Sequence, residues 1–102
     1  MVTTYQLDDY VPTGSSLKGT ISATYDALVE AFGEPNILNA EEGDKVWNEW
    51  GIEFEDGDDY VYATLYDWKE RDAYDSHIGK YRWHIGGKEY RGVELIYEAL
   101  GR

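Results

Sequence analysis

The sequence predicts an α+β domain: a small antiparallel sheet of three to four strands with two helices on one face, in the order β-α-β-β-β-α. Three observations lead to this prediction. Segments 25–32 and 93–100 place apolar residues at helical spacing. Segments 46–55 and 60–68 alternate between apolar and polar residues on either side of an Asp-Gly turn. The length of 102 residues suits one domain.

The beginning of the chain differs in character from the rest. Residues 1–18 are polar and include Pro12 and the run Thr13-Gly14-Ser15-Ser16, which is typical of a weakly ordered segment. We expect a flexible N-terminal arm over 1–18, with at most a short strand near residues 5–7. The single α+β domain is expected over 19–102, beginning with a short strand at 19–23.

The first helix has clear start and stop signals. Thr24 or Ser22 can cap its N-terminus, and Asp26 in the first turn interacts favourably with the positive helix end. Gly33 and Pro35 end it. The apolar stripe that should pack on the sheet consists of Tyr25, Leu28, Val29 and Phe32.

A hairpin should follow the polar, acidic loop over 36–44. Its first strand, 46–55, has Asn48, Trp50, Ile52 and Phe54 on one face and Trp47, Glu49, Glu53 and Glu55 on the other. The turn is Asp56-Gly57-Asp58-Asp59. The return strand, 60–68, has Val61, Ala63 and Leu65 on one face and Tyr60, Tyr62, Thr64, Tyr66 and Trp68 on the other.

A third strand is expected over 81–85, after a charged connection over 69–80. Gly86-Gly87 should break this strand and allow a tight turn into the last helix. That helix carries the stripe Val93, Ile96, Tyr97 and Leu100 and should end near Gly101.

Charge and composition argue against nucleic-acid binding, membrane binding and cysteine chemistry. The first 60 residues hold 14 acidic and 2 basic side chains, and residues 61–102 hold seven of each, so the net charge of −12 belongs to the first part. Such a surface repels nucleic acid and anionic lipid and attracts basic protein faces. The lack of cysteine excludes disulfides and thiolate sites. With no signal peptide or membrane-spanning run expected, we predict a cytoplasmic protein that binds neither membrane nor nucleic acid.

Several segments together resemble a known group of proteins. These are Trp47-Asn48-Glu49-Trp50-Gly51-Ile52-Glu53-Phe54, Ala63-Thr64-Leu65-Tyr66-Asp67-Trp68-Lys69 and, most specifically, Trp83-His84-Ile85-Gly86-Gly87 before the last helix. The chain resembles a group of small, largely uncharacterised proteins encoded by bacteriophages, over roughly residues 19–100. The resemblance implies phage origin, a fold and, for such gene products, action on host machinery in the host cytoplasm. It implies no catalytic residues.

The acidic and aromatic residues are the main candidates for partner binding. The carboxylates expected to pair with Lys and Arg of a partner are Glu41, Glu42, Asp44, Glu49, Glu53, Glu55, Asp56, Asp58 and Asp59. Tyr60, Tyr62 and Trp68 are expected to supply the apolar anchor, since tyrosine and tryptophan dominate interface hot spots. Solvation of an acidic surface and a role of the tyrosines in the core are the simpler alternatives.

Other chemistry has weaker support. A metal site in the Asp56–Asp59 turn lacks EF-hand spacing. Hydrolysis using His77 or His84 would need a serine or threonine oriented beside the histidine. Ser76 and His77 are adjacent in the sequence, and such neighbours rarely face each other productively. The glycines after His84 lack a nucleotide-binding fingerprint. We therefore expect no cofactor, no metal and no enzymatic activity.

The function predicted from these features is inhibition. We expect a phage-encoded acidic protein that binds a host defence protein, such as a nucleic-acid-processing enzyme, by presenting carboxylates in place of DNA or RNA phosphates. One alternative is a small-ligand-binding module with a pocket around Trp83, His84 and Gly86. Another is a self-associating structural protein, a homodimer formed through the tyrosine row.

Overall fold

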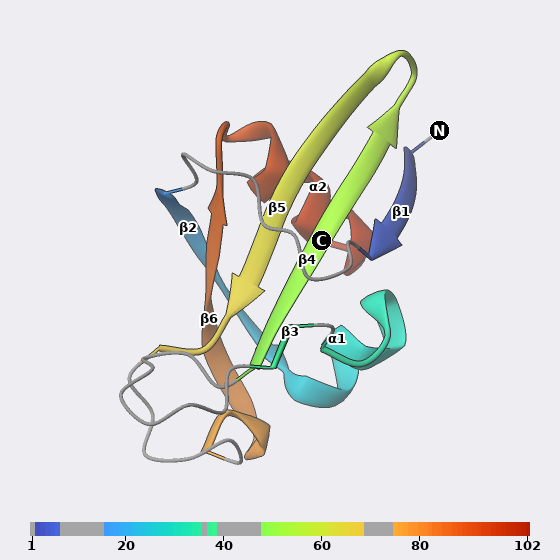
Figure 1. The fold of residues 1–102 in the computed structure, drawn as a ribbon. Coiled ribbons are helices and arrows are strands. Elements are labelled where there is room, and N and C mark those ends of the chain that lie inside the picture. Colours follow the sequence, from blue (N-terminus) through green and yellow to red (C-terminus); the bar gives the residue numbers. More distant parts are fainter. Residues whose placement is uncertain (1, 7–15, 36, 39–47, 69–74) are drawn as a thin grey trace.

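The computed structural model describes residues 2–6, 16–35, 37–38, 48–68 and 75–102 (Figure 1). One antiparallel sheet has the strand order β1-β4-β5-β6-β2, and β3 pairs with β4 beside β1. The strands are β1 (Val2–Gln6), β2 (Ser16–Thr24), β3 (Ile37–Leu38), β4 (Asn48–Asp56), β5 (Asp59–Tyr66) and β6 (Lys80–Gly87). The helices are α1 (Tyr25–Phe32), α2 (Arg91–Ala99) and the short 3₁₀ helix η1 (Asp75–His77).

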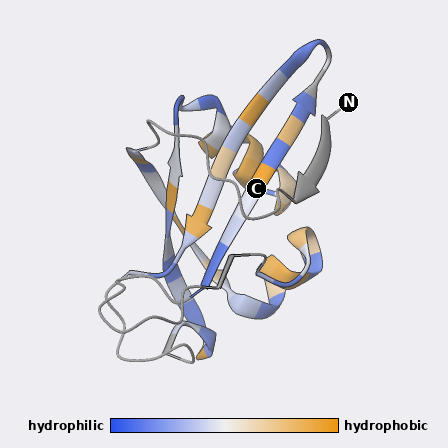
Figure 2. Cartoon of the chain, in the orientation of Figure 1, coloured by the Kyte–Doolittle hydropathy of each residue, from blue (hydrophilic) through white to orange (hydrophobic). Residues whose placement is uncertain are grey.

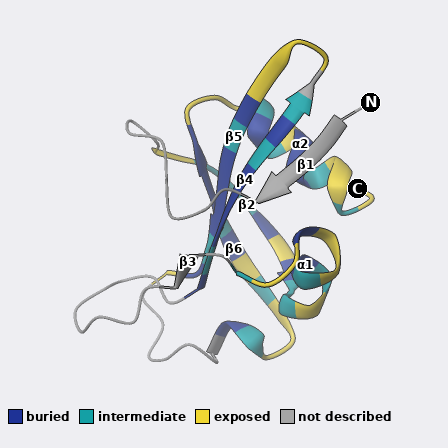
Figure 3. Ribbon diagram, turned by 45° about the vertical axis from the view of Figure 1, so that its right-hand side comes forward, coloured by how far each residue is buried: buried dark blue, intermediate teal, exposed yellow. Residues whose placement is uncertain are grey.

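The predicted fold class is confirmed. The elements β2, α1, β4, β5, β6 and α2 follow the predicted order, and both helices lie on one side of the sheet (Figure 3). β1 and the two-residue β3 enlarge the sheet at the outer edge of β4. β1 lies inside the segment predicted as a flexible arm, and β2 begins at Ser16, three residues before the predicted boundary. Residues 7–15 of that segment lie outside the described residues.

Local sequence explains α1. The Thr24 hydroxyl accepts a hydrogen bond from the Ala27 backbone N–H at 3.1 Å, so Thr24 is the N-cap. Gly33 ends the helix with a φ of 82°, a conformation that glycine adopts without steric cost. Leu28 and Phe32 are buried, and Tyr25 and Val29 pack at the edge of the core, as the predicted stripe requires.

Two tryptophans organise the core between the sheet and the helices. Trp50 of β4 and Trp83 of β6 are fully buried and meet edge to face, with ring centroids 5.3 Å apart. The indole N–H of Trp50 donates to the Gly33 carbonyl at 2.8 Å, and that of Trp83 donates to the Ala23 carbonyl at 3.0 Å. Both buried donors are therefore satisfied, and each bond joins separate elements of the fold.

The prediction that Gly86-Gly87 end the third strand is wrong, because β6 continues through both glycines. Their small size serves packing against β5. A Cβ at position 86 would lie 2.6 Å from the Thr64 hydroxyl oxygen, and a Cβ at position 87 would lie 2.9 Å from the Tyr62 carbonyl oxygen. These distances are too short for any side chain, so the glycines allow β5 and β6 to pack closely.

The edge strand β2 is contacted by α2 and by the C-terminal residue that follows it. The Tyr97 hydroxyl donates to the Thr20 carbonyl at 2.7 Å, and the Arg102 guanidinium donates to the Ser22 carbonyl at 2.6 Å. Thr20 and Ser22 alternate with Ile21 and Ala23, whose side chains are buried in the core. Two polar side chains thus satisfy backbone carbonyl groups of an edge strand.

Candidate functional site

The face of the sheet opposite the helices, here called the outer face, carries the predicted acidic and tyrosine rows. Alternation along β4 and β5 separates these residues from the core residues Trp50, Ile52, Val61 and Leu65. The antiparallel register then pairs the rows one to one: Glu49 with Tyr66, Glu53 with Tyr62, and Glu55 with Tyr60. The acids and tyrosines are therefore neighbours on one surface.

Exposure along this face is uneven. Glu49, Glu53 and Tyr62 are half-buried, and Thr64 in the middle of β5 is only 5% exposed. The end of the β4–β5 hairpin is different, because residues 57–60 are all exposed and Tyr60 keeps 56% of its surface. Figure 3 shows this exposed end, and Figure 2 shows that it is strongly hydrophilic. On this face, the exposed acidic side chains among the described residues thus lie at the hairpin end.

The hairpin extends past the neighbouring strand (Figure 1). β6 pairs only with residues 63–66 of β5, so residues 59–62 continue beyond the end of β6. The strands are joined by a two-residue loop, Gly57 and Asp58, with Asp56 opposite Asp59. Gly57 has a φ of 65°, which fits the tight turn predicted from the Asp-Gly sequence.

Not all predicted site residues come together. Tyr60 and Trp68 lie near opposite ends of β5, about 25 Å apart at the rise of a β-strand, so they do not form one anchor. Asp56 ends β4, but its side chain is outside the described residues. Glu41, Glu42 and Asp44 also lie outside the described residues. The hairpin end therefore unites Glu53, Glu55, Asp58, Asp59, Tyr60 and Tyr62.

Trp68 belongs to an aromatic cluster at the other end of the outer face. Its ring lies 6.2 Å from that of Tyr66 and 6.1 Å from that of His84, and Tyr66 stacks on His84 at 5.5 Å. Burial, together with the negative charge of Glu49, raises the pKa of Tyr66. Within the described part of the chain, the buried Nδ1 atom of His84 has no hydrogen-bond partner.

A buried carboxylate lies behind this cluster. Asp67 is fully buried and accepts hydrogen bonds from the Asn48 backbone N–H at 3.1 Å, the Asn48 side-chain amide at 2.9 Å and the Ser76 hydroxyl at 3.0 Å. Bonds to a charged group contribute about 1.5–3 kcal/mol each, so this set offsets the desolvation of the carboxylate. The network joins the start of β4, the end of β5 and η1.

The structure also shows where the residues considered for catalysis and ligand binding lie. The Ser76 hydroxyl donates to Asp67, whereas the His77 ring stacks on Tyr25 at 3.6 Å. The two neighbours therefore have different partners. Trp83 is in the core and His84 is on the outer face, so the two side chains do not line a common pocket between sheet and helices.

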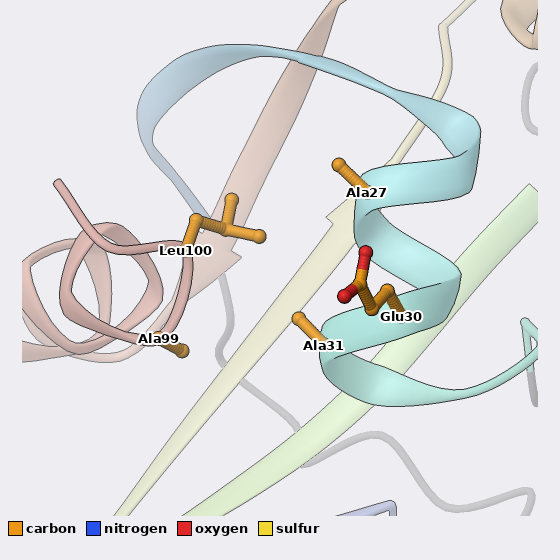
Figure 4. Close-up of a pocket in the computed structure, with 5 residues that line it drawn as sticks. All are labelled: Ala27, Glu30, Ala31, Ala99 and Leu100. Carbon is orange, nitrogen blue, oxygen red and sulfur yellow. The ribbon is translucent and has the colours of Figure 1, made fainter.

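The described residues line a hollow between the helices and another beside the hairpin. One, of about 370 Å³, lies between the two helices and is lined by Ala27, Glu30, Ala31, Ala99 and Leu100 (Figure 4). Its lining is mostly small and apolar. The other, of about 410 Å³, lies beside the hairpin and is lined by Asp59, Tyr60, Val61, Glu89 and Arg91. We call the latter the hairpin hollow.

Glu89 and Arg91 of this hollow were not identified from the sequence. They are distant from the hairpin in sequence, and only the pairing of β5 with β6 brings the start of α2 next to Asp59. Arg91 pairs with Glu94 at 2.7 Å, so its charge is largely balanced within α2. Tyr90, next to Glu89, is 68% exposed, and the Lys18 ammonium lies 5.4 Å from its ring centre.

No protein family, curated protein or solved structure matches the chain. None of the helices in the described part of the chain is long and apolar enough to cross a membrane. Within residues 2–6, 16–35, 37–38, 48–68 and 75–102, no three His, Asp or Glu side chains are grouped so that they could hold a metal ion.

Proposed function

We propose that this protein binds a basic surface of another protein through its β4–β5 hairpin, with carboxylates in the position of nucleic-acid phosphates. The observation that supports the proposal is the exposed, protruding acidic hairpin end, in which Asp58 and Asp59 directly precede the exposed Tyr60. A charged rim steers association, and an exposed tyrosine supplies contact area at low entropic cost.

The density of charge indicates what the hairpin can imitate. Glu49, Glu53, Glu55, Asp58 and Asp59 lie along about 27 Å of hairpin at the usual strand rise. This is about one charge per 5 Å, compared with about 3.4 Å for one DNA strand and about 1.7 Å for the duplex. The hairpin alone therefore resembles a single nucleic-acid strand more than a duplex.

In its biological setting, we propose a phage-encoded inhibitor of a host enzyme that processes nucleic acid. The net charge of −12 supports this proposal, because an acidic protein is attracted to the basic surfaces that bind nucleic acid. The proposed phage origin rests on the sequence resemblance described above. A protein that occupies a nucleic-acid channel should compete directly with the nucleic acid for that channel.

The test is capture of host proteins, with competition by single-stranded and duplex DNA and with two charge-reversed variants. Glu53→Lys with Glu55→Lys alters the outer face at the hairpin, whereas Glu30→Lys with Glu98→Lys alters exposed positions on the helices by the same total charge. We expect the first pair to reduce capture by about tenfold or more and the second to reduce it only slightly. Equal capture by both variants, or capture that DNA does not displace, would contradict phosphate imitation.

A further inference from the structure

We propose that the hairpin hollow receives a lysine side chain from an extended, basic segment of the partner. This segment lies along residues 59–61 of β5, on the edge that faces away from β4. This inference rests on the proposed function and identifies the contact site. It is supported by a strand edge that no described strand covers, by the composition of the hollow and by an internal example of the same chemistry.

The strand edge is the first argument. Residues 59–61 of β5 pair with β4 on one side, and β6 has ended before reaching them on the other. Among the described strands, none continues the sheet beside these residues. An extended peptide can add to such an edge through backbone hydrogen bonds, and the hollow lies along it.

The charged residues of the hollow favour a lysine side chain as the ligand. Asp59 of β5 and Glu89 of the turn between β6 and α2 are both exposed, so their carboxylates can approach one cation from two directions. Arg91 is balanced by Glu94, which leaves the hollow acidic. A lysine ammonium is compact and has three donors, so it suits two separate carboxylates, whereas arginine prefers one planar, bidentate carboxylate.

Aromatic rings favour the same ligand. Tyr60 is one of the lining residues and is 56% exposed. The face of a tyrosine ring attracts cations. Tyr90, next to Glu89 in the chain, already has the Lys18 ammonium 5.4 Å from its ring centre. The corner of the molecule that contains the hollow thus already contains one ammonium–tyrosine contact.

The experiment uses a capped Val-Lys-Val peptide, with matched peptides containing arginine or norleucine in place of lysine. Binding is followed by backbone amide chemical shifts of the full chain. We expect the lysine peptide to shift the amides of residues 59–61 and to bind several-fold more tightly than the norleucine peptide. Shifts confined to other residues, equal binding of the norleucine peptide or tighter binding of the arginine peptide would overturn the proposal.

Matched variants separate this site from general attraction. Glu89→Gln should weaken binding of the lysine peptide by about threefold, and Tyr60→Leu by a similar factor. Glu98→Gln makes the same charge change on α2, away from the hollow, and should not weaken binding. If Glu89→Gln and Glu98→Gln weaken peptide binding equally, the attraction is diffuse, and the proposal that the hollow is the lysine site is wrong. If host capture still depends on Glu53 and Glu55 in that case, the proposed function stands without this site; if it does not, the proposed function fails as well.

Discussion

Tyr25 shows how one residue links α1 to several neighbours. Its ring stacks on His77 at 3.6 Å and lies 5.8 Å from that of Trp50, and its hydroxyl donates to the Glu34 carboxylate at 3.0 Å. Burial, the hydrogen bond to Glu34 and the charges of Glu34 and Asp26 raise the pKa of Tyr25 to about 12. All of these effects favour the neutral phenol over the phenolate.

This shift predicts a loss of stability in alkali. Because the folded protein binds the phenolic proton more tightly than the unfolded chain does, the contribution is complete below about pH 10 and is lost as the pH rises toward about 12. We expect Tyr25→Phe to lose less stability than the wild-type protein between about pH 8 and pH 11, measured by urea denaturation. Tyr60→Phe, at an exposed position, is the control, and identical losses in the wild-type protein and Tyr25→Phe would contradict the prediction.

At the scale of elements, close contact between α2 and β5 depends on Gly92. A Cβ at this position would lie 3.1 Å from the Ala63 Cβ and 3.4 Å from the Tyr62 carbonyl oxygen. Alanine normally favours a helix over glycine by about 1 kcal/mol. Here the tight contact opposes that preference, because α2 must move away from the sheet to accommodate the extra methyl group.

We therefore expect Gly92→Ala to destabilise the protein by about 1–2 kcal/mol, despite its better helix propensity. Ala63→Gly removes the opposing methyl group, so the double variant should recover part of the loss. A double-mutant cycle of unfolding free energies measures this coupling. A more stable Gly92→Ala variant, or strictly additive effects, would show that the contact is not limiting.

Elements with a strong local signal were predicted well from the sequence. The cap at Thr24, the stop at Gly33 and the alternation of Trp50, Ile52 and Phe54 each follow from neighbouring residues. β1 was largely missed, because its place as a strand depends on pairing with β4, which no local pattern encodes. The helical pattern of α2 was recognised, but its buried face includes Leu95 and Gly92, which the predicted stripe omitted.

The candidate site was predicted only in part for a similar reason. Alternation correctly placed Glu53, Glu55 and Tyr62 on the face away from the core. Alternation alone does not show that Tyr60 and Trp68 are far apart in space, because two residues on the same face of an extended segment can still be about 25 Å apart. The approach of Glu89 to Asp59 depends on where β6 ends, which is a property of the tertiary structure.

At the scale of the whole molecule, charge acts on stability and on binding in different ways. A net charge of −12 on one small domain repels itself, and this repulsion depends mainly on the total. The binding proposed for the hairpin depends instead on where the charges lie. The two properties can therefore be separated with the same charge-reversed variants.

We expect sodium chloride, raised to about 0.2 M, to increase the urea midpoint of the wild-type protein by screening this repulsion. The Glu53→Lys, Glu55→Lys pair and the Glu30→Lys, Glu98→Lys pair should both show a smaller gain than the wild-type protein. A midpoint that falls with salt, or a gain unaffected by either variant, would show that self-repulsion does not limit stability.

The contacts of Tyr97 and Arg102 with β2 have a consequence for the behaviour of the protein in concentrated solution. β2 has nine residues and a single charged side chain, Lys18, so it lacks the rows of like charge that keep other sheet edges apart. Its Thr20 and Ser22 carbonyls are already engaged, so an approaching strand would first have to displace a phenol and a guanidinium. We therefore expect Tyr97 and Arg102 to hinder the addition of another strand, and hence fibril growth, at this weakly charged edge.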